Sequence, residues 1–251
     1  MICNKFKDDV IILTSSFFLS CVISFIMKRY LGILSELLII ISLITGVVYK
    51  KDKLDKVNME LKTILIDPGH GGRDNGASYS NILEDEINLS IGSKLYEKCI
   101  TNNYIGYITR TSDYDLSKYD SLNHKNDDLK KRAEYINTLD IDLFVSIHLN
   151  VYPSEDVHGP MVYYKKGSEE SYNLALSVQD ELNRLTNNKK RVTIGEYYLF
   201  KYTTVPGILV ECGFLSNEKE RNLLVLEDYQ NLISNAIFQG IKNNEKLNEK
   251  K

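Results

Sequence analysis

Residues 61–72 read Leu-Lys-Thr-Ile-Leu-Ile-Asp-Pro-Gly-His-Gly-Gly, and this stretch indicates the fold class. A short aliphatic run that stops at Pro68-Gly69 is typical of a buried β-strand that ends in a tight loop. Similar strand patterns recur at 104–109, 141–147, 160–164 and 208–210. Segments with helical spacing separate them, at 87–96, 127–138, 168–185 and 227–241. Because strands alternate with helices, we expect an α/β domain with a mostly parallel central sheet flanked by helices.

Two apolar runs precede this domain. Residues 10–27 carry no charge, Lys28 and Arg29 interrupt the pattern, and residues 31–49 hold only one acid, Glu36. Runs of roughly 18 to 20 apolar residues are long enough for a helix to cross a bilayer. No small-residue cleavage site is evident, so the pattern predicts a membrane anchor rather than a signal peptide.

The anchor has two possible arrangements. Two helices span the membrane with Lys28 and Arg29 in a cytoplasmic turn, as the positive-inside rule favours. Alternatively, one run spans the membrane and the other packs against it or lies in the interface. We predict an anchor at 1–49 with one or two transmembrane helices, a linker at 50–60, a single catalytic domain at 61–243 and a polar tail at 244–251.

Composition narrows the class of protein. The net charge is only -3, which argues against a general nucleic-acid binder. The four cysteines, at positions 3, 21, 99 and 212, include no C-x-x-C pair. A disulfide scaffold and a cysteine-ligated zinc site are therefore not expected.

Side chains that can bind a metal ion or transfer a proton lie where the predicted strands end. His70 lies in a glycine-rich loop after the first strand, His148 ends the strand at 141–147, and Glu211 ends the strand at 208–210. A helix begins with the acids Glu84, Asp85 and Glu86, any of which could supply a ligand. Each feature is ordinary alone, since acids favour helix N-termini. Together, two histidines and a carboxylate are the ligand set of catalytic zinc sites, and a further carboxylate can transfer protons.

Four ordered segments carry a resemblance to a known family. They are Asp67 to Ala77, Glu84 with Asn88-Leu89, Ser146 to Asn150, and Val210 to Asn217. They resemble the motifs D-P-G-H-G-G-x-D-x-G-A, E-x-x-x-N-L, S-I-H-x-N and V-E-x-G-F-L-S-N of the type 3 zinc N-acetylmuramoyl-L-alanine amidases. The resemblance covers roughly Lys62 to Ile241.

The resemblance implies a role for each matching residue. His70, Glu84 and His148 are expected to hold one Zn2+, and Glu211 is expected to be the catalytic carboxylate. Arg110, Arg132 and Asn150 are expected to orient strands and loops, and His124 and His158, which match no motif, to be surface or structural residues. The short segment between Asn150 and Gly207 leaves little room for a helix that covers the zinc, so we expect an open cleft.

The resemblance also implies a substrate and a location. The expected bond joins N-acetylmuramic acid to L-alanine in peptidoglycan, with the catalytic domain on the outer, cell-wall side of the cell membrane. Spore-cortex maturation and vegetative wall turnover remain alternatives, and so does an unidentified activator protein. Two rival functions stay open: a zinc peptidase that cuts within the stem peptide, and a non-catalytic wall-binding protein.

Overall fold

The structure, a computed structural model, describes residues 24, 27–50 and 61–248 of the chain. Its internal contacts divide the chain into two compact units, Met1–Glu60 and Leu61–Lys251. The second unit holds every residue to which the sequence assigns a chemical role.

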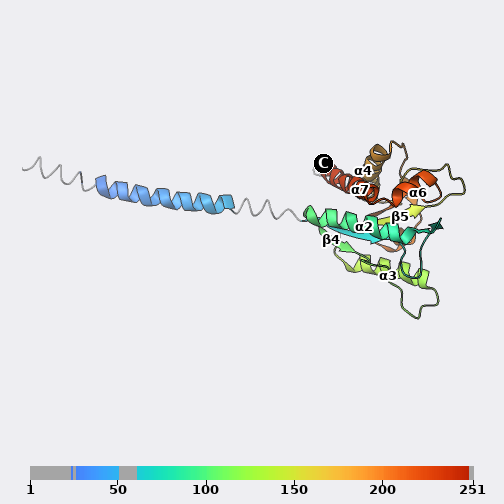
Figure 1. The fold of residues 1–251 in the computed structure, drawn as a ribbon. Coiled ribbons are helices and arrows are strands. Elements are labelled where there is room, and N and C mark those ends of the chain that lie inside the picture. The colour runs from blue at the N-terminus through green and yellow to red at the C-terminus, as the bar shows by residue number, and fades with distance from the viewer. Residues whose placement is uncertain (1–23, 25–26, 51–60, 249–251) are drawn as a thin grey trace, which may run out of the picture. The chain divides into compact units, whose positions relative to one another are not determined.

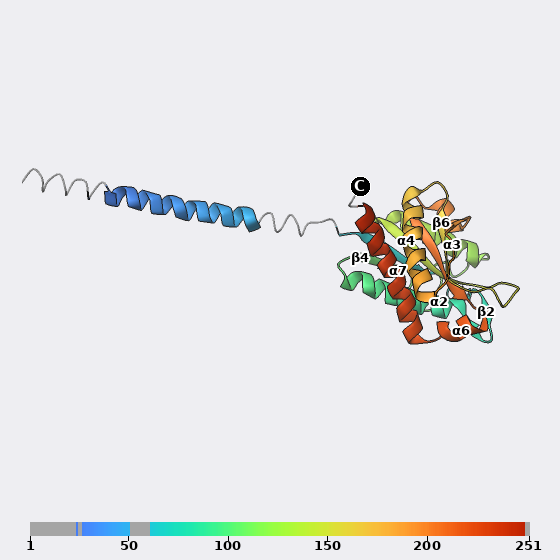
Figure 2. The ribbon, with the colours of Figure 1, turned by 90° about the horizontal axis from the view of Figure 1, so that it is seen from above.

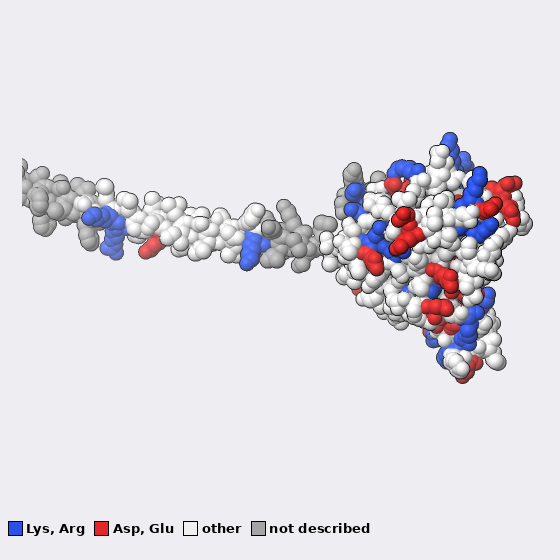
Figure 3. All heavy atoms as spheres, in the orientation of Figure 1, with Lys and Arg blue, Asp and Glu red and all other residues white. Residues whose placement is uncertain are grey.

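The described part of the first unit is a helix, Met27–Lys50, which is long and apolar enough to cross a membrane. Figure 3 shows an almost unbroken uncharged surface on it, with cationic side chains near both ends. Lys28 and Arg29 lie inside this helix, so the turn expected there for two spans is absent from the described residues. Most of the first apolar run, and residues 51–60 of the predicted linker, lie outside the described residues.

The second unit is built around a six-stranded sheet in the order β4-β1-β5-β8-β6-β7. The strands are β1 (Thr63–Pro68), β4 (Ile105–Ile108), β5 (Leu143–Asn150), β6 (Met161–Lys165), β7 (Thr193–Gly195) and β8 (Gly207–Phe214). The first four in spatial order are parallel, whereas β6 runs antiparallel to β8 and β7 runs parallel to β6. The prediction of an α/β fold with a mostly parallel sheet is confirmed.

Helices cover both faces of this sheet (Figures 1 and 2). They are α2 (Glu84–Thr101), α3 (His124–Thr138), α4 (Glu169–Thr186), α5 (Tyr198–Tyr202), α6 (Glu218–Leu224) and α7 (Glu227–Asn248). Ile64 and Ile66 of β1 pack with α2, α4 and α7, while the intervening Leu65 packs with α3 and α5. Strands with apolar side chains on both faces are typical of a parallel sheet that helices bury from both sides.

Several short elements were not predicted from the sequence. They are the hairpin of β2 (Ser78–Tyr79) and β3 (Ile82–Leu83), the edge strand β7, and helices α5 and α6. Helix α7 extends to Asn248, so the first part of the segment predicted as a polar tail is helical.

The strand order places the ends of β1 and β5 at a crevice. From β1 the chain passes through α2 to β4 on one side, and then through α3 to β5 on the other side of β1. Connections that leave two adjacent parallel strands in opposite directions create such a crevice at their carboxyl ends. His70 follows β1 and His148 lies near the end of β5, so both histidines border it.

Two buried arginines fix the loop after β1. Arg132 pairs with Asp67 at 2.6 Å, and its other donors reach the carbonyl oxygens of Pro68 at 2.8 Å and His70 at 2.6 Å. Arg110 donates to the carbonyl oxygens of Pro68 and Gly69, both at 3.0 Å. The two arginines therefore orient a strand end and its loop, as expected from the sequence.

Removal of Arg132 should strongly destabilise the domain. Arg132→Met leaves the Asp67 carboxylate buried without its cation, which costs about 3–5 kcal/mol in other buried pairs. Urea unfolding can follow the near-ultraviolet circular dichroism of the tyrosines, because the chain has 17 tyrosines and no tryptophan. Lys130→Met, an exposed position on the same helix, is the control and should change the free energy of unfolding by less than about 0.5 kcal/mol. Equal stabilities of the two variants would contradict this role of the ion pair.

Candidate active site

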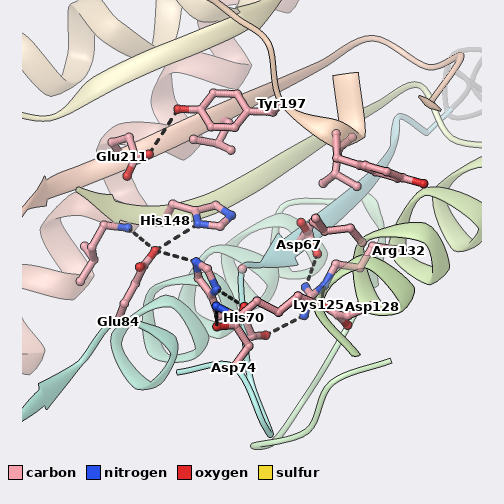
Figure 4. A pocket seen from close by; sticks show the side chains of 16 residues that line it. Asp67, His70, Asp74, Glu84, Lys125, Asp128, Arg132, His148, Tyr197 and Glu211 are labelled. Atoms are coloured by element: carbon pink, nitrogen blue, oxygen red, sulfur yellow. Dashed lines mark hydrogen bonds and ion pairs between the residues drawn. The ribbon is translucent and has the colours of Figure 1, made fainter. Parts of the chain in front are cut away.

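Three side chains from separate elements converge at the crevice (Figure 4). His70 comes from the loop after β1, Glu84 is the first residue of α2, and His148 lies in β5. Their candidate ligand atoms all lie within 4.8 Å of one another. Oε1 of Glu84 is 3.3 Å from Nε2 of His70 and 3.1 Å from Nδ1 of His148. Among the described residues no other histidine, cysteine or acid joins this cluster, so neither Asp85 nor Glu86 replaces Glu84.

Glycines make this convergence possible. A Cβ atom at Gly69 would lie 2.2 Å from the His148 ring, and one at Gly76 would lie 2.5 Å from Oε2 of Glu84. Gly76 also has a φ of +67°, a conformation that glycine adopts without strain. Glycine at these two positions therefore allows the loop that carries His70 to lie in close contact with His148 and Glu84.

Glu84 is held rigidly as an ionised carboxylate. It accepts hydrogen bonds from the backbone N–H groups of Ala77 at 2.8 Å and Leu149 at 3.0 Å, and from Nδ2 of Asn88 at 3.3 Å. Burial acts to raise the pKa of Glu84, but the hydrogen bonds and charges of His148 and His70 outweigh it, so the pKa is lowered. The carboxylate stays charged at neutral pH, as a metal ligand must.

His70 experiences a strongly negative environment. Burial acts to lower its pKa, but Glu84 and Asp74 outweigh this effect and raise the pKa to about 9. Nδ1 of His70 lies 2.9 Å from Oδ2 of Asp74, on the side of the ring away from Glu84. A site that stabilises positive charge between imidazoles and a carboxylate is suited to a divalent cation.

Glu211, unlike Glu84, lies in surroundings that favour its protonated form. It lies on β8 directly beside His148 on β5, and it is buried. Its Oε1 accepts one long hydrogen bond, 3.4 Å from the Tyr197 hydroxyl, and its Oε2 has no hydrogen-bond partner among the described residues. Burial raises the pKa of Glu211 to about 7. A carboxyl group with a pKa near neutrality is suited to accept and return a proton.

A cavity of about 400 Å³ joins these groups. His70, Glu84, His148 and Glu211 line it, together with Lys125 and Leu129 of α3 and the segment 197–199. This volume lies within the range of small-molecule sites. The cavity can therefore hold one reacting end of a larger substrate.

A sequence profile of the N-acetylmuramoyl-L-alanine amidases matches residues 64–243 of this chain. The chain belongs to the N-acetylmuramoyl-L-alanine amidase family. A relative, the germination-specific N-acetylmuramoyl-L-alanine amidase of Bacillus subtilis, is 36% identical over 185 residues, which are 72% of this chain and 78% of that protein. The predictions of family and of enzyme class are thereby confirmed.

Solved structures of amidases have the same fold. The CwlD amidase from Clostridioides difficile, solved in complex with the GerS lipoprotein, is 38% identical with a TM-score of 0.71, covering 74% of this amidase and 99% of that chain. An N-acetylmuramoyl-L-alanine amidase from Clostridium difficile 630 is 30% identical with a TM-score of 0.66, covering 76% and 99% of the two chains.

The remaining histidines of the domain lie away from the cluster, as expected, whereas three neighbours of the site had no role predicted from the sequence. His158 is exposed, with Nδ1 2.8 Å from the carbonyl oxygen of Asp156, and His124 begins α3; neither joins the cluster. Sequence reasoning did not single out Tyr197 or Lys125, because neither lies in a recognised motif. Asp74 was visible as part of the glycine-rich motif, but without a stated role.

The buried Glu211 should make the metal-free amidase less stable as pH rises. The unfolded carboxyl releases its proton near its ordinary pKa of 4.5, whereas the folded one keeps it until about pH 7. Stability is therefore lost between these two values, by roughly 3 kcal/mol. Glu211→Gln removes this loss, so we expect the variant to gain stability over the wild type at pH 8 and to lose that advantage at pH 4.5. Urea unfolding in chelator at both pH values measures it, and an equal difference at both would contradict the assignment.

Proposed function

We propose that this chain is a zinc-dependent N-acetylmuramoyl-L-alanine amidase that hydrolyses the amide between N-acetylmuramic acid and L-alanine in peptidoglycan. The observation that carries the proposal is the convergence of His70, Glu84 and His148, with Glu211 in the same cavity. The membership in the amidase family supports the choice of bond.

The donor atoms fit a zinc ion. Two imidazole nitrogens and one carboxylate oxygen form a set that catalytic zinc sites use, with a fourth position left for water or substrate. The side chains of His70 and His148 keep 24% and 20% of their surface exposed, so a ligand can reach them from the cavity. When bound, zinc would polarise the amide carbonyl and make water easier to deprotonate.

Glu211 performs the proton transfers in this proposal. Its carboxylate takes a proton from the attacking water and delivers that proton to the departing L-alanine nitrogen, which would otherwise leave as an unstable anion. The Tyr197 hydroxyl orients Oε1 of Glu211, and the free Oε2 is available to the reactants. Glu84 keeps its charge throughout, because three hydrogen-bond donors and the two imidazoles favour its ionised form.

The apolar helix and two relatives support proposals for the location and the partner of the enzyme. We propose that the helix Met27–Lys50 anchors the chain in the cell membrane with residues 61–243 on the wall side. The germination-specific relative favours a role in the spore cortex over vegetative turnover. The relative solved with a lipoprotein suggests an activator partner of that kind for this chain as well.

Glu211→Gln should separate metal binding from catalysis. The amide of glutamine cannot accept the proton, so we expect the rate of peptidoglycan hydrolysis to fall by a factor of about 10²–10⁴. The zinc content should remain that of the wild type, because the three ligands are unchanged. Dye release from labelled peptidoglycan and elemental analysis of the same preparation provide the two measurements, and near-normal turnover would refute the role of Glu211.

The products should distinguish the amidase from its two rivals. Digestion of purified peptidoglycan is expected to release intact stem peptides with a free N-terminal L-alanine, and a chelator should stop their release. Mass spectrometry of the soluble fraction identifies these peptides. Fragments cut within the stem would show a zinc peptidase, and binding without any release would show a non-catalytic wall protein.

A further inference from the structure

One carboxylate lies between a proposed zinc ligand and a lysine from another element. Oδ2 of Asp74 is 2.9 Å from Nδ1 of His70, and Oδ1 of Asp74 is 2.8 Å from Nζ of Lys125 (Figure 4). Asp74 belongs to the glycine-rich loop, whereas Lys125 lies in the first turn of α3. The three residues form a chain of contacts that ends at the imidazole ring, which we call the Lys125–Asp74–His70 chain.

The first contact determines which nitrogen of His70 is free. Since Asp74 is a hydrogen-bond acceptor, Nδ1 of His70 carries the proton that it donates. Nε2, which faces Glu84 at 3.3 Å, is then the nitrogen that releases its proton and offers its lone pair when a metal ion binds. A carboxylate on the second nitrogen of a histidine ligand also fixes the orientation of the ring, and loss of such a partner lowers metal affinity by about 10–100-fold.

His70 needs this support because its backbone is in an unusual conformation. Its φ is +62°, and the two residues that follow it are glycines that also have positive φ values. The backbone of His70 is held from α3, since Arg132 donates to its carbonyl oxygen at 2.6 Å. Through Asp74, the same helix also reaches the ring of His70.

The second contact orients Asp74. Among the described residues, Oδ1 of Asp74 otherwise accepts only a long bond, 3.3 Å, from the backbone N–H of Gly76. Lys125 is exposed over 61% of its side chain, so its pair with Asp74 contributes little to the stability of the fold. Its effect should therefore appear at the site rather than in the free energy of unfolding.

We propose that Lys125, acting through Asp74, is a positioning residue that orients the His70 ring and so increases the zinc affinity of the site. This inference rests on the proposed function, since it requires that the site binds zinc. The Lys125–Asp74–His70 chain makes the affinity of the metal site depend on the first turn of α3.

The test measures zinc affinity in the full-length protein in detergent, by competition with a chromogenic chelator. Lys125→Gln should weaken zinc binding about three- to tenfold, Asp74→Asn about 10–100-fold, and Lys125→Arg should restore most of the loss. Lys130→Gln, on an exposed position of the same helix, is the matched control and should bind zinc like the wild type. The thermal midpoint of Lys125→Gln in chelator should equal that of the wild type.

The double variant tests whether Lys125 acts through Asp74. Asp74→Asn with Lys125→Gln should bind zinc no more weakly than Asp74→Asn alone, because the chain is already broken. Additive losses, or a Lys125→Gln variant with wild-type zinc affinity, would overturn the inference while leaving the proposed function intact. A raised KM with unchanged zinc affinity would also overturn it, and would make Lys125 a substrate contact. A wild-type protein that binds no zinc would instead overturn the proposed function and the inference with it.

Discussion

The buried ion pair between Asp67 and Arg132 is the constraint on which the site depends. The carbonyl oxygens of residues 68–70, at the end of β1 and in the loop after it, accept hydrogen bonds from buried side chains. Arg110 and Arg132 supply these donors from inside the domain. Two buried guanidinium groups are costly without a counter-charge. Asp67 provides it for Arg132, together with Asp128 at 2.8 Å, and Ser146 and Thr109 complete the hydrogen bonds of Asp67 at 2.7 and 2.8 Å. The loop that carries His70 is thereby placed by guanidinium hydrogen bonds as well as by the bond that the backbone N–H of Gly69 donates to the carbonyl oxygen of Ile147 in β5 at 2.9 Å.

The sequence predicted the layers of the fold because aliphatic runs and helical spacing both leave a periodic signal. His70, His148 and Glu211 were expected to lie close together, since the carboxyl ends of parallel strands share one edge of the sheet, whereas the choice of Glu84 over Asp85 and Glu86 came from the family motif. The sequence did not predict that β6 is antiparallel, because an alternating pattern carries no direction. Helix α5 and strand β7 are too short for a period, and α5 is placed by the burial of Leu199 and Phe200 against Phe144. Tyr197, which contacts Glu211, belongs to that same segment, so its role could not be read before the fold was known. The contact of Lys125 with Asp74 likewise depends on how α3 packs.

Two buried carboxylates share the cavity, and their surroundings favour different protonation states. Glu84 accepts three hydrogen bonds and faces two imidazoles, so its charged form is favoured. Glu211 is buried and accepts one long hydrogen bond, so its protonated form is favoured. Residue type alone does not separate a ligand from a proton carrier. The number of hydrogen-bond donors around each carboxylate supports the proposed roles, in which Glu84 keeps a fixed charge and Glu211 carries a mobile proton.

Helix α3 connects the two halves of the site. At its first turn, Lys125 reaches Asp74, and two turns later Arg132 holds the carbonyl oxygen of His70. Near its end, Asn137 donates to the carbonyl oxygen of Tyr202 at 2.8 Å and accepts from the N–H of Thr204 at 3.0 Å, which fixes the end of α5. The segment that leads into α5 carries Tyr197 and so orients Glu211. Helix α3 therefore supports both His70, a proposed metal ligand, and the segment that orients Glu211, the proposed proton carrier, while the pairing of β5 with β8 places Glu211 beside His148.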